Sequence, residues 1–259
     1  MTSFLVGTPS DEVPEVLATG RCDVTNIFVS MSARHPEGGD ADYLRWHCFD
    51  HRPEQYRLAS LRGSLRLVST PACRAARAVS HARFEAVDHV MTYLFADLAG
   101  LKPFNDLAVS LGGAGRIPYL LPLVERGVYN LVGMSAAPRV KVGADVLAWW
   151  PLKGAYLLIE EGEASGSDLA EVPGVAGTWW GTGIGLDPQD PDFSTVDGVP
   201  YSQSAGLHIT YCFLDGYPVD TAPLLREALE KRWSDAAVVP LFAAPFYPVV
   251  GDSYDRRVP

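Results

Sequence analysis

The feature that most constrains the fold is an order of predicted elements that occurs twice along the 259 residues. Runs rich in β-branched and aromatic residues predict strands, and period-2 alternation supports the one that contains His89 to Phe95. Strands and intervening helices of the first half are predicted at residues 25–32, 42–51, 65–69, 83–95, 103–111 and 128–134. The first half therefore has the order strand, helix, strand, strand, helix, strand.

The second half repeats this order with one weaker helix. Its elements are predicted at residues 154–160, 167–171, 175–180, 207–214, 221–233 and 238–249. Pro173-Gly174 stops the short first helix, whereas Asp220 or Thr221 caps the longer second helix. Prolines in the last strand predict edge-like pairing.

The order β-α-β-β-α-β is that of the ferredoxin-like unit, which packs helices on one face of an antiparallel sheet. The other face of such a sheet needs a cover, and a second copy in the same chain supplies one. We therefore expect an α+β fold in which two tandem ferredoxin-like units form an intramolecular α+β barrel with antiparallel sheets. Its parts would be an N-terminal arm (1–22), a first half (23–142) and a second half (143–259).

The first predicted helix carries the side chains most suited to chemistry. Asp40 or Asp42 is expected to cap it, and Pro53 is expected to end it near His51. At 100° per residue, one face of this helix presents Tyr43, Leu44, His47, Cys48 and His51. The apolar members predict that this face is turned toward the sheet.

We predict catalytic roles for three residues of this face. An imidazole with a pKa near 6.5 suits proton transfer at neutral pH, so His51 is the candidate general acid or base, with His47 as its partner. Tyr43 could donate a hydrogen bond to a carbonyl or enolate oxygen. Histidines on partly apolar helix faces are also commonly structural, and that alternative stays open for both.

Three further residues are predicted to bind a substrate. His89 and Tyr93 share one face of a predicted strand, so both could reach the same pocket as the histidines. Trp46 is the third candidate, although Trp46 and Phe49 could equally be packing residues between halves or subunits. The supply of aromatic residues in the strands favours an apolar pocket for a flat ligand. The proline-rich segment 187–200 is a candidate lid over it.

The arrangement Tyr43-x-x-Trp46-His47-x-x-x-His51-x-Pro53-Glu54 resembles the EthD-like proteins of the dimeric α+β barrel superfamily. The strand at 63–68 and the run Val172-Pro-Gly-Val175 add to this resemblance. It implies the fold above, but members of the superfamily include cofactor-free monooxygenases, cyclases, isomerases and haem enzymes, so fold does not settle function. In the EthD pattern an aromatic residue stands four positions before the histidine, whereas His47 stands there in this chain.

The resemblance covers the histidine helix of the first half, and the second half has no counterpart. One pocket, in the N-terminal half, is therefore expected. The His47–His51 spacing would also suit a metal, with Asp50 or His89 as a third ligand. In duplicated barrels of this superfamily a helical histidine of the second half binds haem, whereas His208 falls in a predicted strand. We expect neither a metal nor another cofactor.

Composition limits the partners. A net charge of −10 makes nucleic acid and anionic membranes poor partners, and no apolar run is long enough for a transmembrane helix. The N-terminus lacks a signal-peptide pattern, and four separated cysteines without a CxxC motif predict a reduced, cytoplasmic chain. A homodimer is possible but not required.

These features predict a cofactor-independent enzyme acting on a small apolar or aromatic metabolite. The reaction would be of monooxygenase, cyclase, isomerase or lyase type and would use histidine acid/base chemistry. The alternative is a non-catalytic ligand-binding or accessory protein of the same fold, in which the histidines are structural.

Overall fold

The structure is a computed structural model that describes residues 5–162, 165–187, 204–234, 237–250 and 256–259. Apart from Asp187, the predicted lid at 187–200 lies outside these residues. The strands are β1 (Asn26–Ser32), β2 (Leu61–Val68), β3 (Val79–Ser80), β4 (His89–Phe95), β5 (Leu123–Ala136), β6 (Gly154–Glu161), β7 (Val175–Gly183), β8 (Leu207–Leu214) and β9 (Val239–Pro248). Within the described ranges, no helix combines the length and apolar character needed to cross a membrane.

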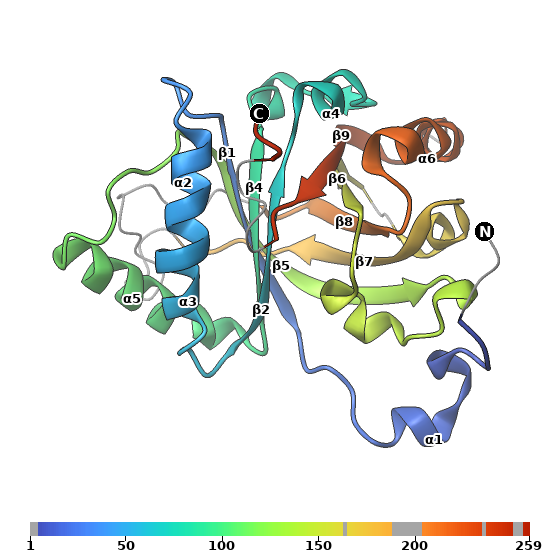
Figure 1. Ribbon diagram of the computed structural model, residues 1–259. Coiled ribbons are helices and arrows are strands. Elements are labelled where there is room, and N and C mark those ends of the chain that lie inside the picture. Colours follow the sequence, from blue (N-terminus) through green and yellow to red (C-terminus); the bar gives the residue numbers. More distant parts are fainter. Residues whose placement is uncertain (1–4, 163–164, 188–203, 235–236, 251–255) are drawn as a thin grey trace.

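Eight of these strands form a closed antiparallel ring (Figure 1). Neighbours follow the order β2-β4-β1-β5-β7-β8-β6-β9, and β9 returns to β2. The four long strands of each half have the same neighbour order: the second, the third, the first and the fourth. The short β3 joins β9 from outside the ring. The expected α+β architecture with a large antiparallel sheet is confirmed.

The two seams between the halves differ in extent. Strands β5 and β7 pair from Tyr129–Gly183 to Ala136–Gly177. A side chain at Gly177 would collide with the carbonyl oxygen of Ser135, so this seam needs a glycine there. At the other seam, β9 meets β2 at Tyr247 and Pro248 and pairs along most of its length with β6. The prediction of edge-like pairing is wrong, because β9 pairs with β6 on one side and with β3 and β2 on the other.

Side chains from both halves fill the interior of the ring. The interior is built mainly from large apolar groups, including Ile27, Met31, Leu67, Val90, Leu94, Leu157, Trp179, Phe213 and Phe246. Among them, the hydroxyls of Thr92 on β4 and Tyr211 on β8 lie 2.7 Å apart and form a hydrogen bond. This bond joins the two halves inside an apolar core.

Helices cover the outside of the ring (Figure 1). The α-helices are α1 (Pro14–Leu17), α2 (Asp40–Trp46), α3 (Arg52–Gln55), α4 (Pro71–Ala75), α5 (Leu101–Gly113) and α6 (Pro218–Trp233). A π-helical turn, η2 (His47–His51), joins α2 to α3. Short 3-10 turns are η1 (Ser10–Glu12), η3 (Ala82–Phe84), η4 (Leu98–Gly100), η5 (Pro138–Val140), η6 (Ala144–Trp149) and η7 (Ser167–Glu171). The stunted helix predicted at 167–171 is the turn η7.

The helices on the N-terminal half explain one difference from the predicted pattern. Strand β4 alternates in sequence as a half-exposed strand would, yet all seven of its residues are buried. One face of β4 points into the ring and the other lies under α2, η2 and α5, so neither face meets solvent.

Helix α6 begins at Pro218 instead of the predicted Thr221, because proline suits the first turn of a helix.

The Thr92–Tyr211 bond gives a test of how the halves are joined. Tyr211→Phe leaves the buried Thr92 hydroxyl without its partner, so we expect a loss of about 1–3 kcal/mol in the free energy of unfolding. The double variant Thr92→Val/Tyr211→Phe removes both polar groups and is expected to recover most of this loss. Urea unfolding of the wild type, of the single variants Thr92→Val and Tyr211→Phe and of the double variant measures the coupling between the two hydroxyls, and additive losses would contradict it.

Candidate functional site

The histidine segment is one continuous helix that changes from α to π geometry at His47. In a π turn each N–H bonds the carbonyl five residues earlier, so residues i and i+5 lie above one another. The rings of Trp46 and His51 accordingly stack, with centroids 4.9 Å apart and planes inclined by 31°. The wider turn also displaces the carbonyls that the ring of Pro53 would meet in an α-helix. The prediction that the helix ends near His51 is wrong, because this turn carries it on to Gln55.

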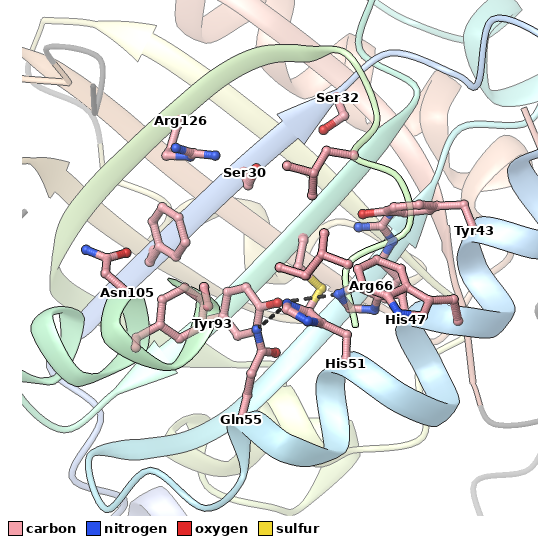
Figure 2. A pocket seen from close by; sticks show the side chains of 17 residues that line it. Ser30, Ser32, Tyr43, His47, His51, Gln55, Arg66, Tyr93, Asn105 and Arg126 are labelled. Carbon is pink, nitrogen blue, oxygen red and sulfur yellow. Dashed lines mark hydrogen bonds between the residues drawn. The ribbon is translucent and has the colours of Figure 1, made fainter. Parts of the chain in front are cut away.

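A pocket of about 130 Å³ lies between this helix, α5 and the outer face of the N-terminal sheet (Figure 2). Its apolar wall is formed by Phe28, Met91, Phe104, Ala108, Ile117 and Leu120. Its polar and aromatic lining consists of Ser30, Ser32, Tyr43, Trp46, His47, His51, Gln55, Arg66, Tyr93, Asn105 and Arg126. Figure 2 shows the histidines and Gln55 on the helix and Ser30, Ser32 and Arg126 on the strands. The described lining contains no carboxylate.

His51 is oriented by two neighbours within its own helix. Its Nε2 atom lies 3.0 Å from Nε2 of Gln55, one turn later, and Trp46 covers its ring. Because an amide nitrogen donates, His51 Nε2 accepts and Nδ1 carries the proton. Turning the Gln55 amide over reverses the contact and makes Nδ1 an acceptor. In the described part of the chain Nδ1 is buried and has no hydrogen-bond partner.

His47 lies deeper beside Tyr93. Its Nε2 atom is 3.4 Å from the Tyr93 hydroxyl on β4, and its Nδ1 atom has no hydrogen-bond partner among the described residues. The rings of His47 and His51 have centroids 5.7 Å apart. Burial raises the pKa of Tyr93 well above its ordinary value, so the tyrosine keeps its proton. The pocket thus contains two imidazoles whose second nitrogens are unused.

Both imidazoles are neutral at neutral pH. Burial lowers the pKa of His51 to about 4, and the raising effect of Asp50 is smaller. Burial lowers the pKa of His47 well below its ordinary value as well, and the positive charge of Arg66 lowers it further. Each ring is therefore unprotonated at neutral pH, and burial makes it a weaker base than a free imidazole.

Arg66 is one of the pocket residues that the sequence did not indicate. It lies on β2, and its guanidinium stacks 5.0 Å from the ring centroid of Tyr43. Its Nη2 atom is 3.1 Å from Nδ1 of His89, whose Nε2 atom is 2.8 Å from the carboxylate of Asp40. Since a guanidinium only donates, His89 accepts at Nδ1 and donates to Asp40. The result is a buried chain from carboxylate through imidazole to guanidinium.

The prediction that Asp40 or Asp42 caps the helix is wrong. The carboxylate of Asp40 instead belongs to the buried Asp40–His89–Arg66 contacts. The N-cap of α2 is Gly39, and no side chain bonds there. The Asp40 carboxylate accepts from the His35 N–H and from His89. Burial raises the pKa of Asp40, but these two hydrogen bonds outweigh it and the pKa lies below its ordinary value. Burial lowers the pKa of His89 to about 4, so this imidazole is neutral too.

The structure brings five of the six predicted site residues together. Tyr43, Trp46, His47, His51 and Tyr93 all line the pocket. His89 is fully buried behind it and reaches the pocket through Arg66. The catalytic and binding roles themselves remain predictions. One signal could have indicated Arg66: it is a charged residue between Leu65 and Leu67 in a strand whose neighbours are apolar.

The corresponding place in the C-terminal half is packed with apolar side chains. Between α6 and the sheet, the core includes Tyr156, Leu158, Leu169, Val175, Cys212, Leu214, Leu225 and Leu229. The buried carboxylate of Glu160 accepts hydrogen bonds from Arg232 and Trp233 at its edge. His208 lies on β8, the strand predicted for it. Over the described residues, no three or more His, Cys, Asp or Glu side chains form a group that could hold a metal.

Comparison with known proteins identifies a fold and no family. No known family matches the chain, and no curated protein matches it. A solved structure named "Putative Chlorite dismutase" aligns at 10% identity and TM-score 0.52 over 89% of this chain and 97% of that chain. An anthrone oxidase-like protein aligns at 12% identity and TM-score 0.45 over 88% and 92%. The first of these shows that the chain has the ferredoxin-like α+β barrel fold.

The neutral histidines predict a loss of stability in mild acid. The unfolded chain protonates them below pH 6.5, whereas the folded chain keeps His51 and His89 neutral down to about pH 4. The unfolded state then binds more protons, so the free energy of unfolding falls between these pH values, by on the order of a few kcal/mol. His51→Gln removes one of these groups and is expected to reduce the slope. Urea unfolding of the wild type and of His51→Gln between pH 6.5 and pH 4 tests the fall in stability and its smaller slope in the variant. A wild-type free energy of unfolding that does not change over this range would contradict the expectation.

Proposed function

We propose that the protein is a cofactor-independent enzyme that acts on a small apolar or aromatic metabolite by proton transfer. One observation carries the proposal: two neutral imidazoles with unused nitrogens lie in one mostly apolar pocket. A neutral imidazole can remove a proton from an acidic C–H or O–H group. The apolar wall would hold the ligand and exclude water.

In this proposal His51 is the general base and returns the proton as an acid later in the reaction. Gln55 and Trp46 position its ring, and turning the Gln55 amide over would leave Nδ1 unprotonated. The Tyr43 hydroxyl would donate to the carbonyl or enolate oxygen that gains charge. His47, held beside Tyr93, would be the partner of His51.

We further infer that the chain is a tandem repeat of two ferredoxin-like units, at 23–142 and 143–259, related to the EthD-like proteins. The equal neighbour order of the strands in the two halves supports the repeat. The histidine helix followed by Pro53 and Glu54 supports the relationship. The second unit would then have exchanged its pocket for an apolar core.

The enzyme proposal is tested by proton exchange. Enolisable ketones of single-ring size are incubated with the protein in D₂O, and NMR follows loss of the acidic C–H protons. Compounds that exchange faster with protein are then tested with His51→Asn, which is expected to lower the rate at least about 100-fold. His81→Asn, at an exposed histidine away from the pocket, is the matched control and should keep the full rate.

The same experiment separates the enzyme from a ligand-binding protein of this fold. A compound that binds in the pocket without exchange, with unchanged affinity in His51→Asn, would support binding without catalysis. The hydrogen bonds that His47 and His51 already make are the observation that favours this second function. An unchanged exchange rate in His51→Asn would contradict the role of His51.

A further inference from the structure

The pocket contains a buried cation without an adjacent carboxylate. Arg66 is only 4% exposed, and its guanidinium contacts the ring of Tyr43 and the neutral imidazole of His89. Its Nε–H is buried and has no hydrogen-bond partner within the described part of the protein. A buried charge is costly unless it is paired, and a buried donor without an acceptor adds to that cost.

The negative charge nearest to Arg66 in its hydrogen-bonded surroundings is Asp40, which is separated from it by His89. The negative charge of Asp40 lies on the far side of the His89 ring, where it holds His89 as an acceptor for Arg66. On the pocket side, His47 and His51 are neutral and the described lining has no acidic residue. Arg66, Ser30 and Tyr43 line that side, and the Nε–H of Arg66 has no hydrogen-bond partner among the described residues. This arrangement is suited to a negatively charged ligand.

The size and the wall of the pocket indicate the rest of the ligand. A cavity of about 150 Å³ can bind one benzene molecule, and this pocket is about 130 Å³. Phe28 and Phe104 meet edge to face with ring centroids 5.6 Å apart, and Tyr93 packs edge to face on Phe104 at 4.7 Å. These rings offer a surface for one planar ring in the pocket that Arg66 also lines.

We propose that the pocket binds a single-ring carboxylate whose carboxylate pairs with Arg66, while its ring lies on Phe28 and Phe104. A guanidinium binds carboxylates through parallel N–H bonds, and the free Nε–H supplies one of them. His89 and Asp40 act as positioning residues that hold Arg66 toward the ligand. The proposal rests on the proposed function only in taking this pocket as the ligand site, and it names the class of ligand.

The test compares benzoate with benzamide, which has the same shape and no charge. Calorimetric titration at pH 7 is expected to show that benzoate binds the protein at least about tenfold more tightly. Arg66→Met should remove this preference by weakening benzoate and leaving benzamide unchanged. Arg45→Met, at an exposed residue of α2, is the matched control and should keep the preference for benzoate.

Two results would overturn the proposal. One is a wild-type protein that does not prefer benzoate, including one that binds neither compound; this comparison needs no variant. The other is an Arg66→Met protein, shown to be folded by its thermal unfolding, that keeps the preference. If Arg66→Met does not fold, Arg66→Lys replaces it and is expected to weaken benzoate binding, because lysine lacks the planar donor pair.

The benzoate–benzamide comparison can succeed or fail independently of the catalytic proposal. A preference for benzoate that depends on Arg66, without proton exchange of any compound, would support the ligand class and contradict the enzyme. Exchange of neutral ketones that depends on His51, without a preference for benzoate, would support the enzyme and contradict the ligand class.

Discussion

The packed interior of the closed ring is the constraint on which the pocket depends. Because side chains of a strand alternate between its faces, filling the ring with Val29, Leu67 and Val90 turns the intervening residues outward. The register then aligns Ser30 with Met91 and Met91 with Arg66 across three strands. A shift of one residue would bring the arginine into the apolar interior, so the packing of the core holds the polar residues of the site on the outer face.

Burial under the helices gives these outer residues their chemical state. The same desolvation that keeps His47 and His51 neutral makes the cation of Arg66 costly, and only a hydrogen bond to His89 and the ring of Tyr43 are seen to stabilise it among the described residues. The C-terminal half shows the other outcome of the same architecture. There α6 covers an apolar face, and the buried charge of Glu160 is paired within the protein. Among the described residues, the pocket of the N-terminal half therefore contains buried polar atoms without partners, whereas the buried charge of Glu160 in the C-terminal half is paired.

The π turn determines which helical side chains lie over the buried outer face of the sheet. It allows the helix to continue past Pro53, and it places Trp46 over His51 and Gln55 next to it. In an α-helix Trp46 and His51 would point 140° apart, as 100° per residue requires, and the tryptophan would leave the pocket. The extra residue per turn thus decides which side chains face the cavity, in keeping with the frequent occurrence of π turns at functional sites.

The sequence by itself determined the order of the elements, the positions of most strands and the histidine face of the first helix. These follow from local patterns of apolar residues and from proline and glycine, which act over a few positions. Only the tertiary structure decided which strands pair at the two seams of the expected barrel, that the π turn brings Trp46 to the pocket and that Asp40 supports His89 instead of capping a helix. Arg66 became part of the site for the same reason: its partners lie 23 or more positions away in the chain, and pairing across strands brings them together.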